Sequence, residues 1–318
     1  MTVELSIIIV NWNGGELLAR CVESVVAAPP SVAYEVVVVD NASGDDSLAM
    51  MRAGPGASAL ERGGRLRVVE NRDNKGFGRA NNQAFAMTKA PLLFLLNPDT
   101  EVTPGSIDRL IATVRQGERT GGAGPRLVNS DGSLQVSVWR NPPAAWEMLV
   151  SGLRLYKLLP GRLRGELLLA EFWPHDRRRD VTMLSGAAIL VRREVIEEVG
   201  GFDERFHMYG EDNEWCLRIV RAGWRLVFEP EAVVLHHGAQ SSMKRWGAQE
   251  KLRVQAEALL DFQRLCLPRR SRIANLAAGC FLLSLQLAAR RLRGRESRDV
   301  GTTLRLYAED LRRALRGG

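Results

Sequence analysis

The first hundred residues alternate short apolar runs with helical patterns, and this alternation restricts the fold more than any other feature of the chain. Runs rich in Val, Ile and Leu predict four strands, at residues 5–10, 34–39, 66–70 and 92–96. Apolar residues spaced by three or four predict helices at residues 16–27 and 79–88. Alternating strands and helices are typical of βαβ units. The sequence therefore predicts an α/β domain whose mostly parallel sheet is flanked by helices.

The predicted strands are followed by polar residues, namely Asn11, Asp40, Asn71 and Asn97. An open parallel sheet binds its ligands outside the carboxyl ends of its strands. We therefore expect these side chains to border one cleft.

The second half of the chain begins with an irregular stretch at residues 137–180, which holds three tryptophans and several prolines. We interpret this stretch as a long surface excursion. Order then returns, and the apolar pattern predicts a strand, two helices and one or two further strands at residues 183–191, 194–199, 211–222 and 225–235.

The positive charge of the chain is concentrated at its C-terminal end. Residues 267–318 hold 12 Arg and Lys against 4 Asp and Glu, whereas the net charge of the whole chain is +7. We therefore predict two parts: an α/β domain over residues 1–266 and a basic, amphipathic helical tail over residues 267–318.

Within that tail, residues 273–289 form an apolar run flanked on both sides by arginines. Because a spanning helix needs about 20 apolar residues, we interpret the run as a helix lying in the interface of an anionic membrane. The alternative is a helical pair packed on the core or on a second copy of the chain, as in a homo-oligomer. The tail has no aromatic platform and no reading motif, so we expect no nucleic-acid partner.

Composition excludes a disordered chain, since 45% of the residues are hydrophobic and 25% are charged. The four cysteines form no C-x-x-C pair, and Cys21 and Cys216 fall on apolar positions of predicted helices. This pattern indicates buried thiols in a reducing compartment. The chain starts with a strand and no secretory signal is recognisable, so we expect a cytoplasmic protein, peripheral on the inner face of the membrane.

Several residues at the predicted sheet edge can bind a nucleotide. The carboxylate of Asp40, with Asn41 beside it, can accept a hydrogen bond from the imide of uracil or thymine; it can equally cap a helix. The segment NKGFGRANN, residues 74–82, joins a strand to a helix but lacks both the dinucleotide and the P-loop glycine patterns. It is either a ligand-contacting loop or a simple tight turn.

Other residues can serve metal binding and proton transfer. Asp99 in NPDT follows a fully apolar strand and can hold Mg²⁺ or Mn²⁺, although an Asx-Pro turn explains the motif as well. His236 and His237 end another predicted strand and can add a nitrogen ligand or be purely structural. Glu211 and Asp212 open a helix, where they can act as a general base or simply cap the helix.

Six segments in this order resemble glycosyltransferase family 2, most closely its bacterial rhamnosyltransferase-type members. The segments are SIIIVNWN, VVVVDNASGDD, NKGFGRANNQA, LLFLLNPDT, SGAAILVRREVIEEVGGFDERFHMYGEDNEWCLR and HHGAQSS. The resemblance covers residues 3–242 and implies a GT-A fold, with a Rossmann-like mixed sheet, and inverting transfer by direct displacement.

The resemblance also implies roles for individual residues. Asp40 corresponds to the base-contacting residue, Asp99 to the last carboxylate of the D-x-D metal motif, and Asp212 to the catalytic base, with Glu211 beside it. His236 is the expected metal ligand from its spacing to Ser241, and His237 is the alternative. Asn97 replaces the first acid of D-x-D, which leaves one fewer charge on the ion. We expect donor contacts from Asn11, Asp40, Asn41, Asn74, Lys75, Gly76, Asn81 and Asn97.

The sequence therefore predicts a metal-dependent glycosyltransferase that uses a nucleotide-diphospho-sugar donor, with dTDP-rhamnose favoured, and a lipid-linked or polysaccharide acceptor of the cell envelope. A nucleotide-sugar hydrolase is the first alternative, but the acidic helix and the Trp-rich excursion favour a bulky acceptor over water. A non-catalytic nucleotide-sugar binding module is the second, and it would need neither Glu211 nor Asp212.

Overall fold

The structure is a computed structural model that describes residues 2–206, 209–238 and 248–316. Contacts along the chain divide it into two compact units. The first consists of Met1–Trp139 and His175–Ser241, and the second of Arg140–Pro174 and Ser242–Gly318. The predicted boundary at residue 266 falls at the end of helix α11 (Ala248–Cys266), inside the second unit.

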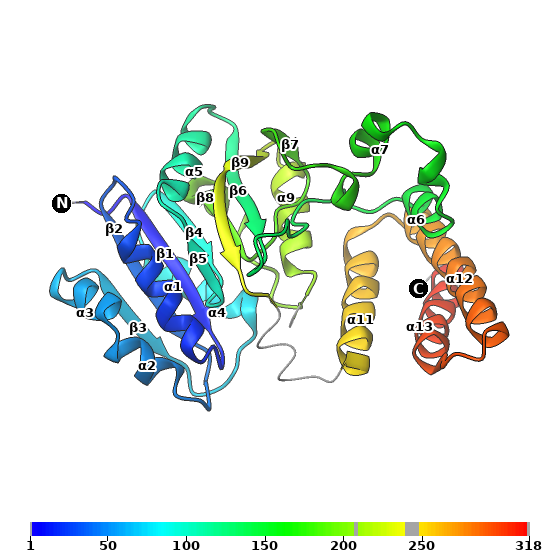
Figure 1. Ribbon diagram of the computed structural model, residues 1–318, viewed down its shortest axis with the longest axis horizontal. Helices are drawn as coiled ribbons and strands as arrows, with labels where there is room; N and C mark the ends of the chain where they lie inside the picture. Colours follow the sequence, from blue (N-terminus) through cyan, green and yellow to red (C-terminus); the bar gives the residue numbers. More distant parts are fainter. Residues whose placement is uncertain (1, 207–208, 239–247, 317–318) are drawn as a thin grey trace. The chain divides into compact units, whose positions relative to one another are not determined.

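The first unit contains one mixed sheet of nine strands within the described residues (Figure 1), in the order β3-β2-β1-β4-β8-β6-β9-β5 with β7 beside β9. Strands β1, β2, β3 and β4 are parallel, and β6 is parallel to β9. Strands β5, β7 and β8 run antiparallel to their neighbours. The strands are Leu5–Asn11, Tyr34–Asp40, Leu66–Glu70, Leu92–Leu96, Thr100–Val102, Thr120–Val128, Arg179–Val181, Ala188–Arg192 and Arg225–His236.

Helices cover both faces of this sheet, which explains why β1 and β4 are apolar at nearly every position. Alternate residues such as Ile7 and Phe94 pack into one core with helices α1, α2, α3 and α5. Their neighbours Ile8 and Leu93 face the other way and are equally buried. The helices of the first unit are α1 (Glu16–Ala27), α2 (Ser47–Ala53), α3 (Pro55–Arg62), α4 (Phe77–Met87), α5 (Ser106–Arg115), α8 (Arg193–Val199) and α9 (Glu211–Arg221).

The second unit is helical and joins two segments that are far apart in the sequence. Its upstream segment forms α6 (Ala145–Gly152), η1 (Leu155–Leu158), α7 (Gly161–Leu168) and η2 (Ala170–Phe172). Its C-terminal segment forms α11 (Ala248–Cys266), α12 (Arg269–Leu292) and α13 (Arg298–Arg316), so the predicted tail is helical. Close packing of α12 on α13 depends on Gly279, since a Cβ there would lie 2.5 Å from the ring of Tyr307.

Two expectations need correction. The stretch at residues 137–180 is only partly a surface excursion, because Val138 and Trp173 are buried and residues 140–174 belong to the second unit. The strand predicted at residues 183–191 begins only at Ala188, because Ser185 and Gly186 form a turn closed by the bond from Ala188 N–H to Ser185 O (3.3 Å). The buried thiols are confirmed for Cys21 and Cys216, which are both free.

Candidate active site

The strand ends that were predicted to border a cleft do meet at one edge of the sheet. Asn11 and Asp40 are paired residues at the ends of the parallel strands β1 and β2. Strand β4 ends next to them at Leu96, and the antiparallel β8 starts opposite that residue at Ala188. The turn before β8 is thereby brought to the same edge as the predicted donor-binding residues.

Asp40 holds the loop that follows β2. Its carboxylate accepts hydrogen bonds from Asn11 Nδ2 (2.8 Å), Ser43 Oγ (2.6 Å) and Ser43 N–H (3.0 Å). Helix α2 begins only at Ser47 and has no side-chain cap, so Asp40 does not cap it. Asn11 is fully buried, and its Oδ1 has no hydrogen-bond partner among the described residues.

A network of amides joins the β2 end to the glycine-containing segment. Asn41 Nδ2 donates to Asn74 Oδ1 (2.9 Å), and Asn41 Oδ1 accepts from Lys75 N–H (3.0 Å). Gly76 has a φ of 86° and precedes α4, so the segment makes a turn that favours glycine. The Lys75 side chain is exposed, whereas Asn81 is buried and donates to Phe77 O (2.9 Å).

The NPDT segment is a turn, and this turn also directs Asp99 to a histidine. Thr100 Oγ1 donates to Asn97 O (2.6 Å), which closes the turn. Asp99 Oδ1 then lies 3.3 Å from His236 Nε2. The register of β5 and β9, in which Thr100 faces His236, produces this approach.

His236 and His237 have different surroundings. Gln135 Oε1 lies 2.6 Å from His236 Nδ1. The other polar atom of the same amide, Gln135 Nε2, donates to Asn129 Oδ1 (3.0 Å). The atom that faces the histidine is therefore the amide oxygen, which can only accept, so Nδ1 carries the proton. In the neutral form of the ring, Nε2 would then face Asp99 Oδ1 with its lone pair, so that both atoms could bind one cation. Both nitrogens of His237 are engaged, one with Ser130 and one with Glu101 (2.8 Å each).

This pair fits a divalent cation. A neutral imidazole whose other N–H donates to an oxygen is the usual form of a metal-ligating histidine, and Asp99 supplies a hard oxygen ligand. No group of three or more His, Cys, Asp or Glu side chains with metal-binding geometry occurs among the described residues. An ion here would therefore need oxygens from elsewhere, such as a diphosphate. Ser241, on which the choice of His236 depended, lies outside the described residues.

Asp212 lies at the start of α9 and accepts three N–H groups. Gly186 N–H donates to its Oδ2 (3.2 Å), while the backbone and side-chain N–H groups of Asn213 donate to its Oδ1 (2.8 and 3.3 Å). Trp139 Nε1 donates to Asn213 Oδ1 (3.1 Å) and so orients that amide. Sequence reasoning missed Trp139 and Asn213 in this role, as it missed Gln135.

The backbone connects Asp212 to the metal-binding candidates. Gly186, which donates to Asp212, is followed by Ala187, whose carbonyl accepts a hydrogen bond from Asn97 N–H (2.9 Å). Asn97 begins the turn that carries Asp99. The structure thus brings Asp99, His236 and Asp212 to the same edge of the sheet.

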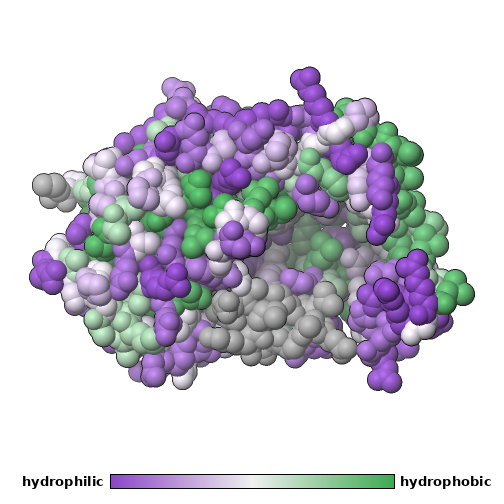
Figure 2. All heavy atoms as spheres, viewed as in Figure 1, coloured by the Kyte–Doolittle hydropathy of each residue, from purple (hydrophilic) through white to green (hydrophobic). Residues whose placement is uncertain are grey.

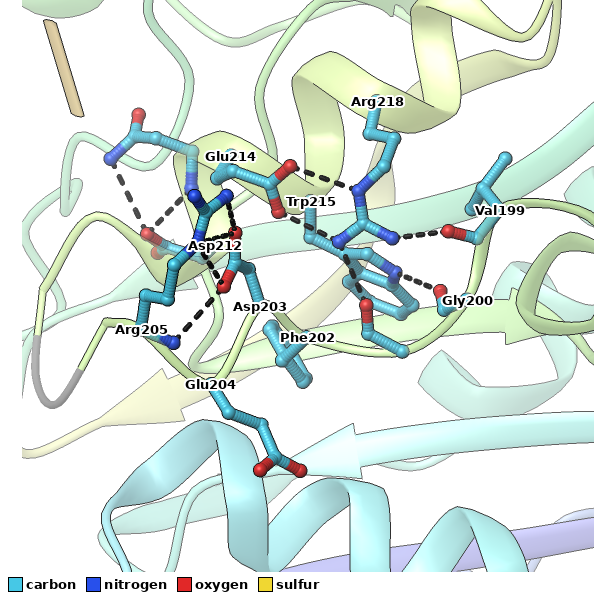
Figure 3. Close-up of polar contacts among 12 residues, drawn as sticks. Val199, Gly200, Phe202, Asp203, Glu204, Arg205, Asp212, Glu214, Trp215 and Arg218 are labelled. Atoms are coloured by element: carbon cyan, nitrogen blue, oxygen red, sulfur yellow. Dashed lines mark hydrogen bonds and ion pairs between the residues drawn. The ribbon is translucent and has the colours of Figure 1, made fainter. Parts of the chain in front are cut away.

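The residues directly after α8 are hydrogen-bonded to α9, as Figure 3 shows. Arg218 binds Glu214 through two hydrogen bonds (2.9 and 2.7 Å) and donates to the Gly201 carbonyl (2.8 Å). Trp215 Nε1 donates to Gly200 O (3.0 Å). These contacts join the end of α8 to the helix that begins with Glu211 and Asp212.

Glu211 and Asp212 are adjacent buried carboxyls with different environments. Burial, and then the charge of Asp212, raises the pKa of Glu211 to about 8. Burial also raises the pKa of Asp212, but the N–H donors of Gly186 and Asn213 oppose that shift. Glu211 Oε2 has no hydrogen-bond partner among the described residues. The negative charge of the pair is therefore better stabilised on Asp212 than on Glu211.

The raised pKa of Glu211 gives a prediction for stability. Between the ordinary pKa of 4.5 and about 8, folded Glu211 keeps a proton that the unfolded chain releases. The free energy of unfolding should therefore fall as the pH rises through this window, by about 1.4 kcal/mol per pH unit from this residue. Glu211→Gln removes the effect, so denaturation from pH 5 to pH 9 should show the variant gaining stability relative to wild type. If wild type and Glu211→Gln differ in free energy of unfolding by the same amount across that range, Glu211 does not hold the proton.

Comparison with known proteins shows the family of this chain. The profile described as "Glycosyltransferase like family 2" matches residues 3–255. The chain belongs to this glycosyltransferase family. An N-acetylglucosaminyl-diphospho-decaprenol L-rhamnosyltransferase of Mycobacterium tuberculosis is 31% identical over 268 residues, which cover 76% of this chain and 78% of the relative. The O-antigen biosynthesis protein RfbC of Myxococcus xanthus is 28% identical over 76% of this chain and 18% of its own length.

Solved structures confirm the GT-A fold of this family 2 enzyme. The mannosyltransferase PcManGT from Pyrobaculum calidifontis, in complex with GDP-Man and Mn2+, superposes with a TM-score of 0.57 at 14% identity, over 98% of this chain and 86% of that one. GalNAc-T7, with UDP, GalNAc and Mn2+, gives a TM-score of 0.54 at 22% identity, over 74% of this chain and 44% of that one. The predicted family, fold and enzyme class are thus confirmed.

Proposed function

We propose that this family 2 enzyme is an inverting rhamnosyltransferase that moves L-rhamnose from dTDP-rhamnose to a lipid-linked or polysaccharide acceptor of the cell envelope. The observation that carries the proposal is the meeting of Asp212 with the Asp99–His236 pair at one sheet edge. The rhamnosyltransferase relative, which covers most of the chain, supports the choice of sugar.

In the proposed reaction, Asp212 takes the proton of the attacking acceptor hydroxyl. The hydroxyl oxygen forms a bond to the anomeric carbon of the donor while the bond from that carbon to the diphosphate oxygen breaks, so the configuration is inverted in one step. Three N–H donors hold the Asp212 carboxylate for this task. Because Glu211 stays protonated at neutral pH, it does not compete for the proton.

The donor diphosphate would be held by Mg²⁺ or Mn²⁺ bound to Asp99 and His236. A divalent cation held there would neutralise the charge that develops on the departing nucleotide diphosphate. Gln135 keeps the His236 ring in the required tautomer. Two structural neighbours were solved with Mn2+, which supports the assignment. Asp40 and Asn41, with the segment that carries Asn74, Lys75 and Gly76, would contact the nucleotide.

Nucleotide sugars offered singly with lipid-diphosphate acceptors test this function directly. Mass spectrometry should detect a product heavier by one rhamnose only with dTDP-rhamnose. Release of free sugar without a glycosylated acceptor would instead support a hydrolase, and product from another donor would overturn the choice of rhamnose.

Metal dependence gives a separate prediction. Wild type should bind thymidine diphosphate at least about ten-fold more tightly with Mn²⁺ than without it, since the ion screens two phosphate charges beside a carboxylate. Asp99→Asn should lose this gain in an isothermal titration. Glu101→Gln is the matched control, because Glu101 is two residues away and binds His237 instead. Equal affinities of wild type and Asp99→Asn, with and without Mn²⁺, would contradict the metal assignment.

A further inference from the structure

In the second unit, helix α6 lies along α12. Asn275 Nδ2 donates to Pro143 O (3.0 Å), and Met148 and Gly152 lie against Gly279 and Leu282. In these contacts the residue numbers increase along both segments, so the two helices run in the same direction. The η1 turn, which follows α6, therefore continues toward the second half of α12.

These elements expose apolar side chains together. Helix α6 is rich in apolar residues, yet none of its residues is buried. Leu158 in η1 is 82% exposed. On α12, Phe281, Leu285 and Leu292 are exposed at spacings of four and seven, which places them on one stripe. Figure 2 shows hydrophobic residues along the right-hand edge of the view, where α6 and α12 lie in Figure 1.

Apart from Glu147 on α6, which binds Arg140, the charged residues of α6, η1 and α12 are all positive. Between Glu147 and Glu166 the sequence has four cations, Arg154, Lys157, Arg162 and Arg164, and no acid. Between Asp261 and Glu296 it has eight arginines and again no acid. We define the apolar-basic face as Trp146, Leu153, Leu155, Leu158, Phe281, Leu285 and Leu292 with Arg154, Lys157 and Arg162.

We propose that the apolar-basic face binds the surface of an anionic lipid bilayer, with its leucines at the acyl boundary and its cations among the headgroups. Leucine and arginine side chains interleaved on one face are suited to that interface. The inference rests on the proposed function to the extent that a lipid-linked acceptor is presented at such a surface.

Two alternatives explain this face less well: α12 could cross a membrane, or the face could bind a second copy of the chain. Helix α12 is the one helix among the described residues that is long and apolar enough to cross a membrane, and 28% of its apolar window is buried. Its first half, however, uses Arg272 to bind the buried Asp310 and Asn275 to bind the Pro143 carbonyl just before α6, so it lies against protein. A second copy of the chain, joined through a two-fold axis, would bring the cations of both copies together.

The test is co-sedimentation of the full chain with phosphatidylcholine vesicles, with and without phosphatidylglycerol, at low and high salt. Wild type should bind only the anionic vesicles and should be released by salt. The double variants Leu155→Asp/Leu158→Asp and Arg154→Glu/Lys157→Glu should each bind at least about ten-fold more weakly. Met50→Asp is the matched control, since Met50 is also exposed (38%) but lies on α2 of the first unit; it should bind like wild type.

Failure of wild type to bind anionic vesicles, unchanged binding by both double variants, or an equal loss in Met50→Asp would overturn the proposal. So would a wild-type dimer in light scattering that Leu155→Asp/Leu158→Asp converts to monomer while vesicle binding stays the same. Transfer to a water-soluble acceptor analogue should be unchanged in both double variants. If wild type and all variants fail to transfer sugar but bind vesicles as expected, the proposed function is contradicted and the membrane-binding proposal is not.

Discussion

Replacement of Asp212 by Asn should lower the rate of sugar transfer by about 10²-fold or more and leave donor affinity nearly unchanged. The amide has almost the same shape as the carboxylate but cannot take the acceptor proton. The donor contacts proposed above do not involve Asp212, so thymidine diphosphate should bind with its wild-type affinity. Steady-state kinetics with saturating donor, together with a nucleotide titration, measure both quantities.

Asp203→Asn is the control for this change. Asp203 is also an acid in the segment around α9, but its carboxylate binds Arg205, whose hydrogen bond lowers the pKa of Asp203. Loss of this exposed contact should alter transfer only slightly. Near-normal turnover of Asp212→Asn would exclude Asp212 as the base and direct attention to Glu211.

Asp310→Ala should lower the free energy of unfolding of the second unit by about 3–5 kcal/mol. The Asp310 side chain is fully buried and binds both Arg264 (2.6 Å) and Arg272 (3.0 Å). Arg272 is itself only 10% exposed, so its charge would remain buried without its main partner. Chemical denaturation followed by far-UV circular dichroism, which reports the loss of helix, measures the effect.

The matched control is Asp261→Asn, because Asp261 binds the same Arg264 (3.0 Å) but is half exposed. An exposed ion pair contributes only about 0–1 kcal/mol, so this variant should unfold almost like wild type. Equal effects of the two substitutions would show that the buried network does not stabilise the helices.

Several parts of the fold could be predicted from the sequence because they depend on local pattern. Strands β3 and β4 and helix α1 have the predicted bounds, since short runs rich in Val and Leu define the strands and a single amphipathic stripe defines the helix. Residues 183–187 were misassigned because their apolar residues surround a Ser-Gly turn. Hydrophobic periodicity does not distinguish a turn that presents Gly186 N–H to Asp212 from a strand.

For the candidate site, the sequence predicted the ionisable residues but not the residues that hold them in place through hydrogen bonds. Asp99, His236 and Asp212 stand at strand or helix ends, where position alone suggests chemistry. Gln135 and Trp139 do not stand at such positions, so nothing in their place along the sequence suggests a role in the site. Gln135 lies 101 positions from His236, and Trp139 lies 74 positions from Asn213, so only the folded chain brings these partners together.

The discontinuous second unit has a consequence for synthesis of the protein. Residues 140–174 leave the ribosome well before α12, the helix against which α6 packs. The first unit can begin to form while α6 still has no partner. The apolar surface of α6 stays open until residues 269–292 of α12 have been made. A chain shortened after Cys266 would keep that surface open permanently. Nascent chains of this enzyme are therefore most vulnerable to chaperone capture and aggregation between the synthesis of α6 and that of α12.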